Sequence, residues 1–134
     1  MASELFRPRE RIRRRLEFLR VYREGRRVHR RGFVLHCAFN GLEFDRLGMA
    51  VSRRVGCAVV RNRAKRRLRE LFRRNKSRSR VGVDLVFSAK PQLATLSFAE
   101  MEKEYRGAVS EARRRLGRRP SRSGSLSEPS ASIN

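Results

Sequence analysis

The sequence has few of the residues that a disulfide-stabilised or metal-binding protein needs. Among its 134 residues there are two cysteines and two histidines, and no tryptophan. Cys37 and Cys57 lie far apart, and neither stands in a CxxC pair or at a zinc-like spacing from a histidine. We therefore expect no disulfide framework, no disulfide-linked partner and no metal site, and this cysteine usage favours the reducing cytoplasm.

Long apolar runs are also lacking. No stretch approaches the roughly 18 apolar residues of a membrane span. The start of the chain, MASELFRPRERIRRR, has no apolar core of the kind found in secretion signals. The sequence thus predicts a cytoplasmic protein without a membrane partner.

Acidic residues are scarce and scattered. The chain has 13 Asp and Glu against 35 Lys and Arg, a formal net charge of +22. Glu43, Asp45, Glu70 and Asp84 fall on different predicted elements, so no carboxylate cluster for metal-assisted hydrolysis is expected and no catalytic residue is assigned. The excess of positive charge instead indicates a polyanionic partner, and nucleic acid is the commonest.

Composition divides the chain into three parts. Residues 1–11 are polar and basic and are expected to be flexible. Residues 120–134 are rich in Ser, Pro and Gly, with almost no bulky apolar side chain, so disorder is expected there. A single folded domain is predicted over residues 12–119.

Hydrophobic spacing within this domain predicts an α+β fold. A helix is expected over 15–24, anchored by Leu16, Leu19 and Val21 and ended by Gly25. Alternating apolar residues predict strands at 32–39, 46–52 and 83–89, with a hairpin-type turn at Asn40-Gly41. A basic helix over about 58–75 and a last helix with a Ser97/Glu100 capping box complete the order α-β-β-α-β-α, with room for a further short strand. The expected architecture is a small sandwich of one sheet packed by helices.

The basic helix is amphipathic rather than a simple run of charges. Its apolar stripe is expected to face the sheet and consists of Val60, Ala64, Leu68, Leu71 and Phe72. Between Arg61 and Lys76 there are nine basic residues and one acid, Glu70. A merely solvated helix face interleaves acids with bases, and a membrane-binding helix needs its apolar side free. A rigid face that neutralises phosphates fits this pattern better than either.

Several segments resemble one known family. Residues 56–70, GCAVVRNRAKRRLRE, resemble the RNR signature of the bacterial ribonuclease P protein subunit. The resemblance continues, in the same order, in EFLRVYREG (17–25), FVLH (33–36), GMAVSRR (48–54) and DLVFSAKP (84–91), and it covers about residues 12–116.

The resemblance implies a fold and a function. Members are small α+β proteins with a left-handed βαβ crossover, and they assist a catalytic RNA that removes the 5′ leader from precursor tRNA. It implies two partners, the ribonuclease P RNA and the precursor tRNA leader. The Mg²⁺ of the reaction is held mainly by the RNA, no organic cofactor is involved, and the protein lowers the Mg²⁺ requirement.

The resemblance also assigns two sets of residues. Contacts to the catalytic RNA fall on Arg53, Arg54, Arg61, Asn62, Arg63, Lys65, Arg66 and Arg69. Contacts to the single-stranded leader fall on Phe18, Tyr22, Val34, His36, Ala50 and Ser52.

Some alternatives stay open from the residues alone. Phe18 and Tyr22 can be ordinary core residues, Asn62 can make a structural bond within its helix, and His36 stands where the family more often has an aromatic residue. For the whole chain, the alternative function is that of a ribosomal-type or RNA-chaperone protein with no role in cleavage. A DNA-binding nucleoid protein is a second alternative.

Overall fold

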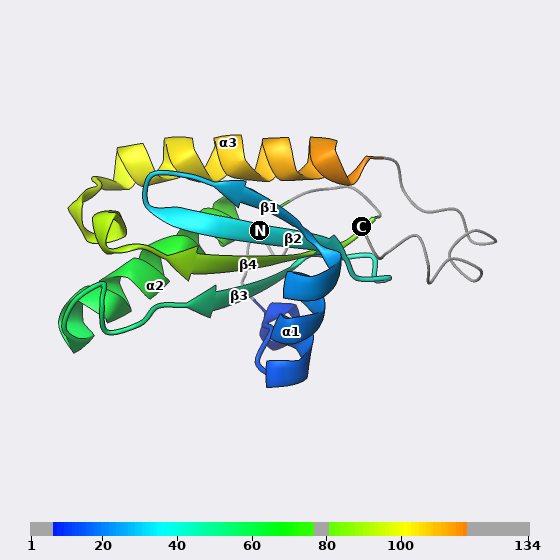
Figure 1. The fold of residues 1–134 in the computed structure, drawn as a ribbon, viewed down its shortest axis with the longest axis horizontal. Helices are drawn as coiled ribbons and strands as arrows, with labels where there is room; N and C mark the ends of the chain where they lie inside the picture. Colours follow the sequence, from blue (N-terminus) through cyan, green and yellow to red (C-terminus); the bar gives the residue numbers. More distant parts are fainter. Residues whose placement is uncertain (1–6, 77–80, 118–134) are drawn as a thin grey trace.

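The computed structural model describes residues 7–76 and 81–117, which form three α-helices, two short 3-10 helices (Pro8–Glu10 and Pro91–Thr95) and a four-stranded sheet (Figure 1). The predicted α+β class, its three helices and its three strands are confirmed. The short strand for which the prediction left room is β1, so the order is α-β-β-β-α-β-α. The elements are α1 (Arg15–Glu24), β1 (Arg26–His29), β2 (Phe33–Phe39), β3 (Arg46–Ala50), α2 (Ala58–Arg74), β4 (Val83–Ala89) and α3 (Phe98–Leu116).

The order of strands in the sheet is β1-β2-β4-β3. β1 and β4 each pair antiparallel with β2, whereas β3 pairs parallel with β4. Along the chain, α2 connects β3 to β4. The hairpin-type turn predicted at Asn40-Gly41 is therefore wrong, because β4 lies between β2 and β3. The Asn40 side chain instead closes the β2–β3 loop: its Oδ1 accepts from the Leu42 N–H at 2.8 Å and its Nδ2 donates to the Phe44 carbonyl at 3.1 Å.

One face of the sheet carries the main hydrophobic core. α2 and α3 cover this face, and in Figure 1 α3 runs along the side of the sheet opposite to α1. The predicted capping box begins α3, with Ser97 and Glu100 exchanging hydrogen bonds. The largest buried side chains are Phe33, Phe72, Phe87 and Tyr105. No helix in the described ranges is long and apolar enough to cross a membrane.

α1 packs on the other face through a much smaller cluster, in which Phe18 joins Ile12, Val21, Ala38 and Val86. Of the three residues predicted to anchor this helix, Leu16, Leu19 and Val21, only Val21 does so. Val21 is fully buried, but Leu16 is 77% exposed and Leu19 is 41% exposed. α1 lies on the sheet along one narrow stripe, so these two leucines point away from it.

The chain before α1 is part of the packed unit. The Ile12 N–H donates to the Leu47 carbonyl at 2.9 Å, and the buried carboxylate of Glu10 pairs with Lys76 at 2.9 Å. The domain thus begins earlier than Ile12. The expected flexibility of residues 1–6 and disorder of residues 120–134 concern parts of the chain outside the described residues.

Candidate nucleic-acid interface

The apolar side of α2 packs in the core, and this leaves the basic face of the helix toward solvent. Ala64, Leu68, Leu71 and Phe72 are buried as predicted, and Val60 is half-buried. The polar residues assigned to the catalytic RNA lie around the remaining surface. Asn62, Arg63 and Arg66 are exposed, while Arg61, Lys65 and Arg69 are half-buried.

Most of this face is not neutralised by the protein's own acids. Glu70, the one acid of α2, pairs with Arg73 at 2.6 Å and Arg74 at 3.1 Å, near the end of the helix. In the described part of the chain, no carboxylate pairs with Arg63 or Arg66. The first turns of α2 therefore keep their positive charge, to which the N-terminal end of the helix dipole adds.

Two further arginines extend this surface. β3 ends at Ala50, so Ser52 lies in the turn before α2 and not in the strand predicted over 46–52. The Ser52 Oγ accepts from the Arg54 N–H at 3.4 Å, and the exposed Arg53 and Arg54 follow it in the turn. Ser52 thus stands between the sheet and the basic helix.

Asn62 is exposed in the second turn of α2. Among the described residues, its side chain makes no hydrogen bond. A structural bond within the helix, one of the two alternatives for this residue, is therefore not seen, and the amide is free to reach a ligand.

The α1 face of the sheet has a part that α1 does not cover. Strand pairing aligns Ala50 with Ser88, Ser88 with Val34, and Val34 with His29, which makes a row of four residues from β3 to β1. These four are exposed or half-buried. We call this row the open strip. It brings together two of the predicted leader residues, Ala50 and Val34, with two that the sequence analysis did not assign, Ser88 and His29.

Tyr22 and His36 form one side of the open strip. Tyr22 is 40% exposed, and its ring meets the His36 ring edge-on, with 4.6 Å between ring centroids. Phe18 lies deeper, 6.4 Å from Tyr22 by ring centroids. A Cβ on Gly48 would lie 3.0 Å from the Phe18 ring, so the absence of a side chain there lets Phe18 rest on the sheet. Phe18 thus mainly packs α1 on the sheet, whereas Tyr22 is accessible.

The His36 imidazole is uncharged at neutral pH. Burial, together with the positive charge of Arg27 and the neighbouring His29, lowers the pKa of His36 to about 4. His36 can therefore stack on a base or form a neutral hydrogen bond, but it does not supply a cation to a phosphate.

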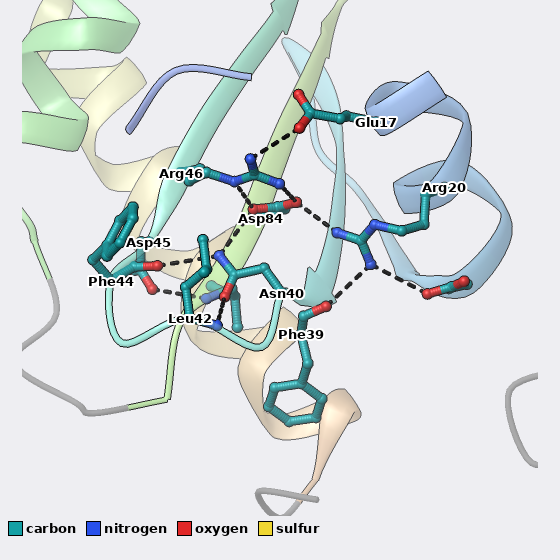
Figure 2. Close-up of polar contacts among 11 residues, drawn as sticks. Glu17, Arg20, Phe39, Asn40, Leu42, Phe44, Asp45, Arg46 and Asp84 are labelled. Carbon is teal, nitrogen blue, oxygen red and sulfur yellow. Dashed lines mark hydrogen bonds and ion pairs between the residues drawn. The ribbon is translucent and has the colours of Figure 1, made fainter. Parts of the chain in front are cut away.

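A buried carboxylate fixes α1 to the sheet (Figure 2). Asp84 on β4 is fully buried, and its oxygens accept from Arg46 at 2.8 Å and from Arg20 of α1 at 2.6 Å. Asn40 donates to the same carboxylate at 2.9 Å, and Arg46 also reaches Glu17 of α1 at 3.1 Å. This network sets the position of α1, and so of Tyr22, over the sheet.

Sequence reasoning considered Asp84 only as one of the scattered acids. The signal that could have found its role is a carboxylate inside the apolar segment VDLVF, because a buried charge needs partners. Among the described residues, no three His, Cys, Asp or Glu side chains gather in a way that could hold a metal ion.

Together, the outward basic helix and the open strip with its exposed aromatic ring define a small RNA-binding α+β protein. Comparison with known proteins specifies the class further. The family model described as Ribonuclease P matches residues 6–113. The chain is 41% identical to the ribonuclease P protein component of Syntrophus aciditrophicus, over 71% of this chain and 80% of that protein. It is 48% identical to that of Desulfovibrio desulfuricans, over 70% of this chain and 75% of that protein.

Solved structures agree with these sequence matches. The Staphylococcus aureus RNase P protein superposes with a TM-score of 0.71 at 30% identity, covering 77% of this chain and 94% of that one. The Thermotoga maritima RNase P protein gives a TM-score of 0.64 at 32% identity, covering 78% of this chain and 96% of that one.

The chain belongs to the bacterial ribonuclease P protein family. It is the protein component of a ribonucleoprotein endonuclease that processes the 5′ end of tRNA, and its partner is the ribonuclease P RNA. Catalysis by that RNA fits the family, and the predicted role as a ribonuclease P subunit that assists tRNA 5′ processing is confirmed, in place of the ribosomal-type, chaperone and DNA-binding alternatives.

Proposed function

We propose that the chain binds the precursor tRNA leader along the open strip while the basic face of α2 binds the ribonuclease P RNA. The observation that carries this proposal is the row from Ala50 to His29, which α1 leaves accessible beside an exposed tyrosine. A strip with small residues at its β3 end and an aromatic side suits single-stranded RNA of any sequence, because every base has a face that can stack.

The residues of the strip have different parts in this proposal. The Tyr22 ring stacks on a leader base, with His36 supporting it edge-on. Ala50 and Ser88 have short side chains, so the nucleotide backbone can approach the sheet closely. Val34 lines the strip, Phe18 holds α1 in place, and Ser52 lies where the leader passes toward α2.

In this proposal the basic face of α2 anchors the protein to the ribonuclease P RNA. Exposed guanidinium groups pair with phosphates and release the counterions condensed on RNA. The proposed contacts to the catalytic RNA are Arg53, Arg54, Arg61, Asn62, Arg63, Lys65, Arg66 and Arg69.

Neutralising phosphates also reduces the need for divalent ions. The protein then lowers the Mg²⁺ concentration at which the RNA folds and cuts, and the Mg²⁺ itself is held mainly by the RNA. We further propose a cytoplasmic location, since Cys37 and Cys57 are both free thiols.

The anchoring and Mg²⁺ parts are tested by cleavage of a precursor tRNA by a bacterial ribonuclease P RNA at low Mg²⁺. Adding this protein is expected to restore cleavage, and the protein alone is expected to give none. If the protein leaves the Mg²⁺ dependence unchanged, that part of the proposal is wrong.

The leader part is tested by placing a negative charge in the strip. Ala50→Glu is expected to weaken binding of leader-bearing tRNA to the reconstituted holoenzyme and to leave mature tRNA binding unchanged. Ala99→Glu, at an exposed position in the first turn of α3, is the matched control. Equal behaviour of the two variants would remove the open strip as the leader site.

A further inference from the structure

The open strip continues into a hollow at the β1 edge of the sheet. This hollow has a volume of about 690 Å³ and is open to solvent. Tyr22, His36 and the strip residue Ser88 line it on the side of the strip. The rest is lined by Gly25 and by four arginines: Arg23, Arg26, Arg27 and Arg115. We call it the basic hollow.

The charge of the basic hollow is largely unneutralised. No carboxylate is among its lining residues, and within the described ranges none pairs with Arg23, Arg26 or Arg27. Arg115 is paired with Glu111 at 2.6 Å, and its Nη1 donates to the Arg27 carbonyl at 2.8 Å. The end of α3 is thereby fixed against β1, and the residues that line the hollow come from α1, β1, β2, β4 and α3.

Strand pairing places Arg27 beside the leader surface. Arg27 is aligned with His36 across the β1–β2 pair, so both side chains project from the α1 face of the sheet. The two groups also interact electrostatically, since Arg27 contributes to the lowered pKa of His36. The hollow and the strip therefore share one continuous surface.

The hollow lies at the far end of that surface from α2. The turn carrying Arg53 and Arg54 follows β3, whereas Arg27 is on β1, at the opposite edge of the sheet. Three strand spacings separate these edges, or about 14 Å. A leader that leaves a catalytic RNA held at α2 meets Ala50 first and reaches the arginines last.

We propose that the basic hollow holds backbone phosphates of the leader nucleotides most distant from the cleavage site, with Arg27 as a principal contact. This inference rests on the proposed leader path. Four guanidinium groups without a lining carboxylate fit the phosphates of a flexible strand, and the hollow extends the stacking surface at Tyr22.

The test uses holoenzyme reconstituted with ribonuclease P RNA and precursor tRNAs whose leaders lengthen one nucleotide at a time. With the unchanged protein, affinity for the precursor tRNA is expected to rise in two stages as the leader lengthens. The first stage comes when the leader covers the open strip, and the second when it reaches the basic hollow. Arg27→Gln is expected to remove the second stage, which weakens binding of long leaders by roughly threefold to fivefold. It is also expected to lower the slope of log affinity against log salt by about 0.7 for each phosphate that is no longer neutralised.

Two variants serve as controls. Arg27→Lys keeps the charge and is expected to restore most of the second stage. Arg114→Gln changes an exposed arginine of the same last turn of α3 that does not line the hollow, and it is expected to behave as the unchanged protein.

Two outcomes overturn the inference. If Arg27→Gln has no effect on long leaders while Tyr22→Ala weakens short ones, the leader path stands and the hollow is not part of it. If Arg27→Gln weakens leaderless tRNA equally, the hollow contacts the catalytic RNA instead. Failure of Tyr22→Ala to affect any leader would overturn the proposed function itself.

Discussion

The two surfaces that we propose to bind RNA are built in opposite ways. The basic face of α2 comes from one continuous stretch of sequence and is densely charged. The open strip takes one residue from each of four strands and is bordered by Tyr22 of α1 and His36 of β2, and its four residues include no arginine, lysine, aspartate or glutamate. In the proposed function the first surface acts by charge, which extends over several ångströms and is screened by salt. The second is proposed to act by shape and stacking, which require contact.

This difference makes the surfaces unequally dependent on the fold. α2 presents its arginines as long as its apolar stripe stays on the sheet. The strip also needs α1 at the correct height, and α1 is held by a small apolar cluster together with the Asp84 network. Damage to the network should therefore separate the two functions.

The largest expected effect comes from Asp84→Asn. It leaves Arg20 and Arg46 without their buried counter-charge, so we expect a loss of about 2 to 3 kcal/mol in the free energy of unfolding, measured by urea denaturation. Leader affinity is expected to fall, while affinity for the catalytic RNA stays close to normal. Glu24→Gln, which removes only the exposed partner of Arg20, should cost less than about 0.5 kcal/mol. Equal losses in the two variants would mean that the network does not hold α1.

The converse change is Arg63→Gln combined with Arg66→Gln. Both side chains are exposed, so stability is expected to stay unchanged. Affinity for the ribonuclease P RNA, measured in a salt titration, is expected to fall by about tenfold, with a salt slope smaller by roughly 1.5 because two phosphates are no longer neutralised. The preference of the assembled holoenzyme for leader-bearing over mature tRNA should be retained. Disappearance of that preference would contradict the division between the surfaces.

A smaller effect concerns pH. The pKa of His36 is about 4 in the folded protein, below the ordinary value of 6.5, so the unfolded chain binds more protons between these two pH values. Stability due to this group is therefore lost as pH falls from about 6.5 to about 4. His36→Phe is expected to remove this contribution to the free energy of unfolding, which is on the order of 1 kcal/mol once solvent screening is allowed for. Urea denaturation of both proteins at pH 7 and at pH 4.5 measures it. An unchanged pH dependence would mean that His36 titrates as an exposed histidine.

The smallest effect is expected at Leu16. Its side chain is 77% exposed, so Leu16→Ala should change the free energy of unfolding by less than about 0.5 kcal/mol. Val21→Ala, at the fully buried position of the same helix, provides the contrast and should cost clearly more. Thermal denaturation of the two variants side by side decides this, and a large destabilisation at Leu16 would show that α1 packs by a different face.

The same difference between the surfaces explains what the sequence could predict. The α2 stripe and its basic side were predicted correctly because both follow from the helical period of one segment, and the Ser97/Glu100 capping box is equally local. The strand order was not predictable, because the Asn40-Gly41 signal is local while the placement of β4 between β2 and β3 is a long-range choice. For the same reason the neighbours of Ala50, namely Ser88 and beyond it His29, could not be named.

Buried polar contacts were the other gap. Nothing in the spacing of Arg20, Arg46 and Asp84 along the chain shows that they meet, since 64 and 38 positions separate the two arginines from the aspartate. The error at Leu16 and Leu19 has a related cause. Helical periodicity shows that a helix has an apolar side, but how wide a stripe becomes buried depends on the surface it meets.

The most direct test of this account is binding of leader-bearing and mature tRNA to holoenzyme that contains Tyr22→Ala. Tyr22 is the exposed aromatic residue beside the strip. Removing the ring on which one base stacks is expected to cost about 1–3 kcal/mol of binding free energy. Binding of leader-bearing tRNA should therefore weaken by roughly fivefold to a hundredfold, with mature tRNA unchanged. Equal weakening of both, or of neither, would contradict the claim that the open strip binds the leader while α2 binds the catalytic RNA.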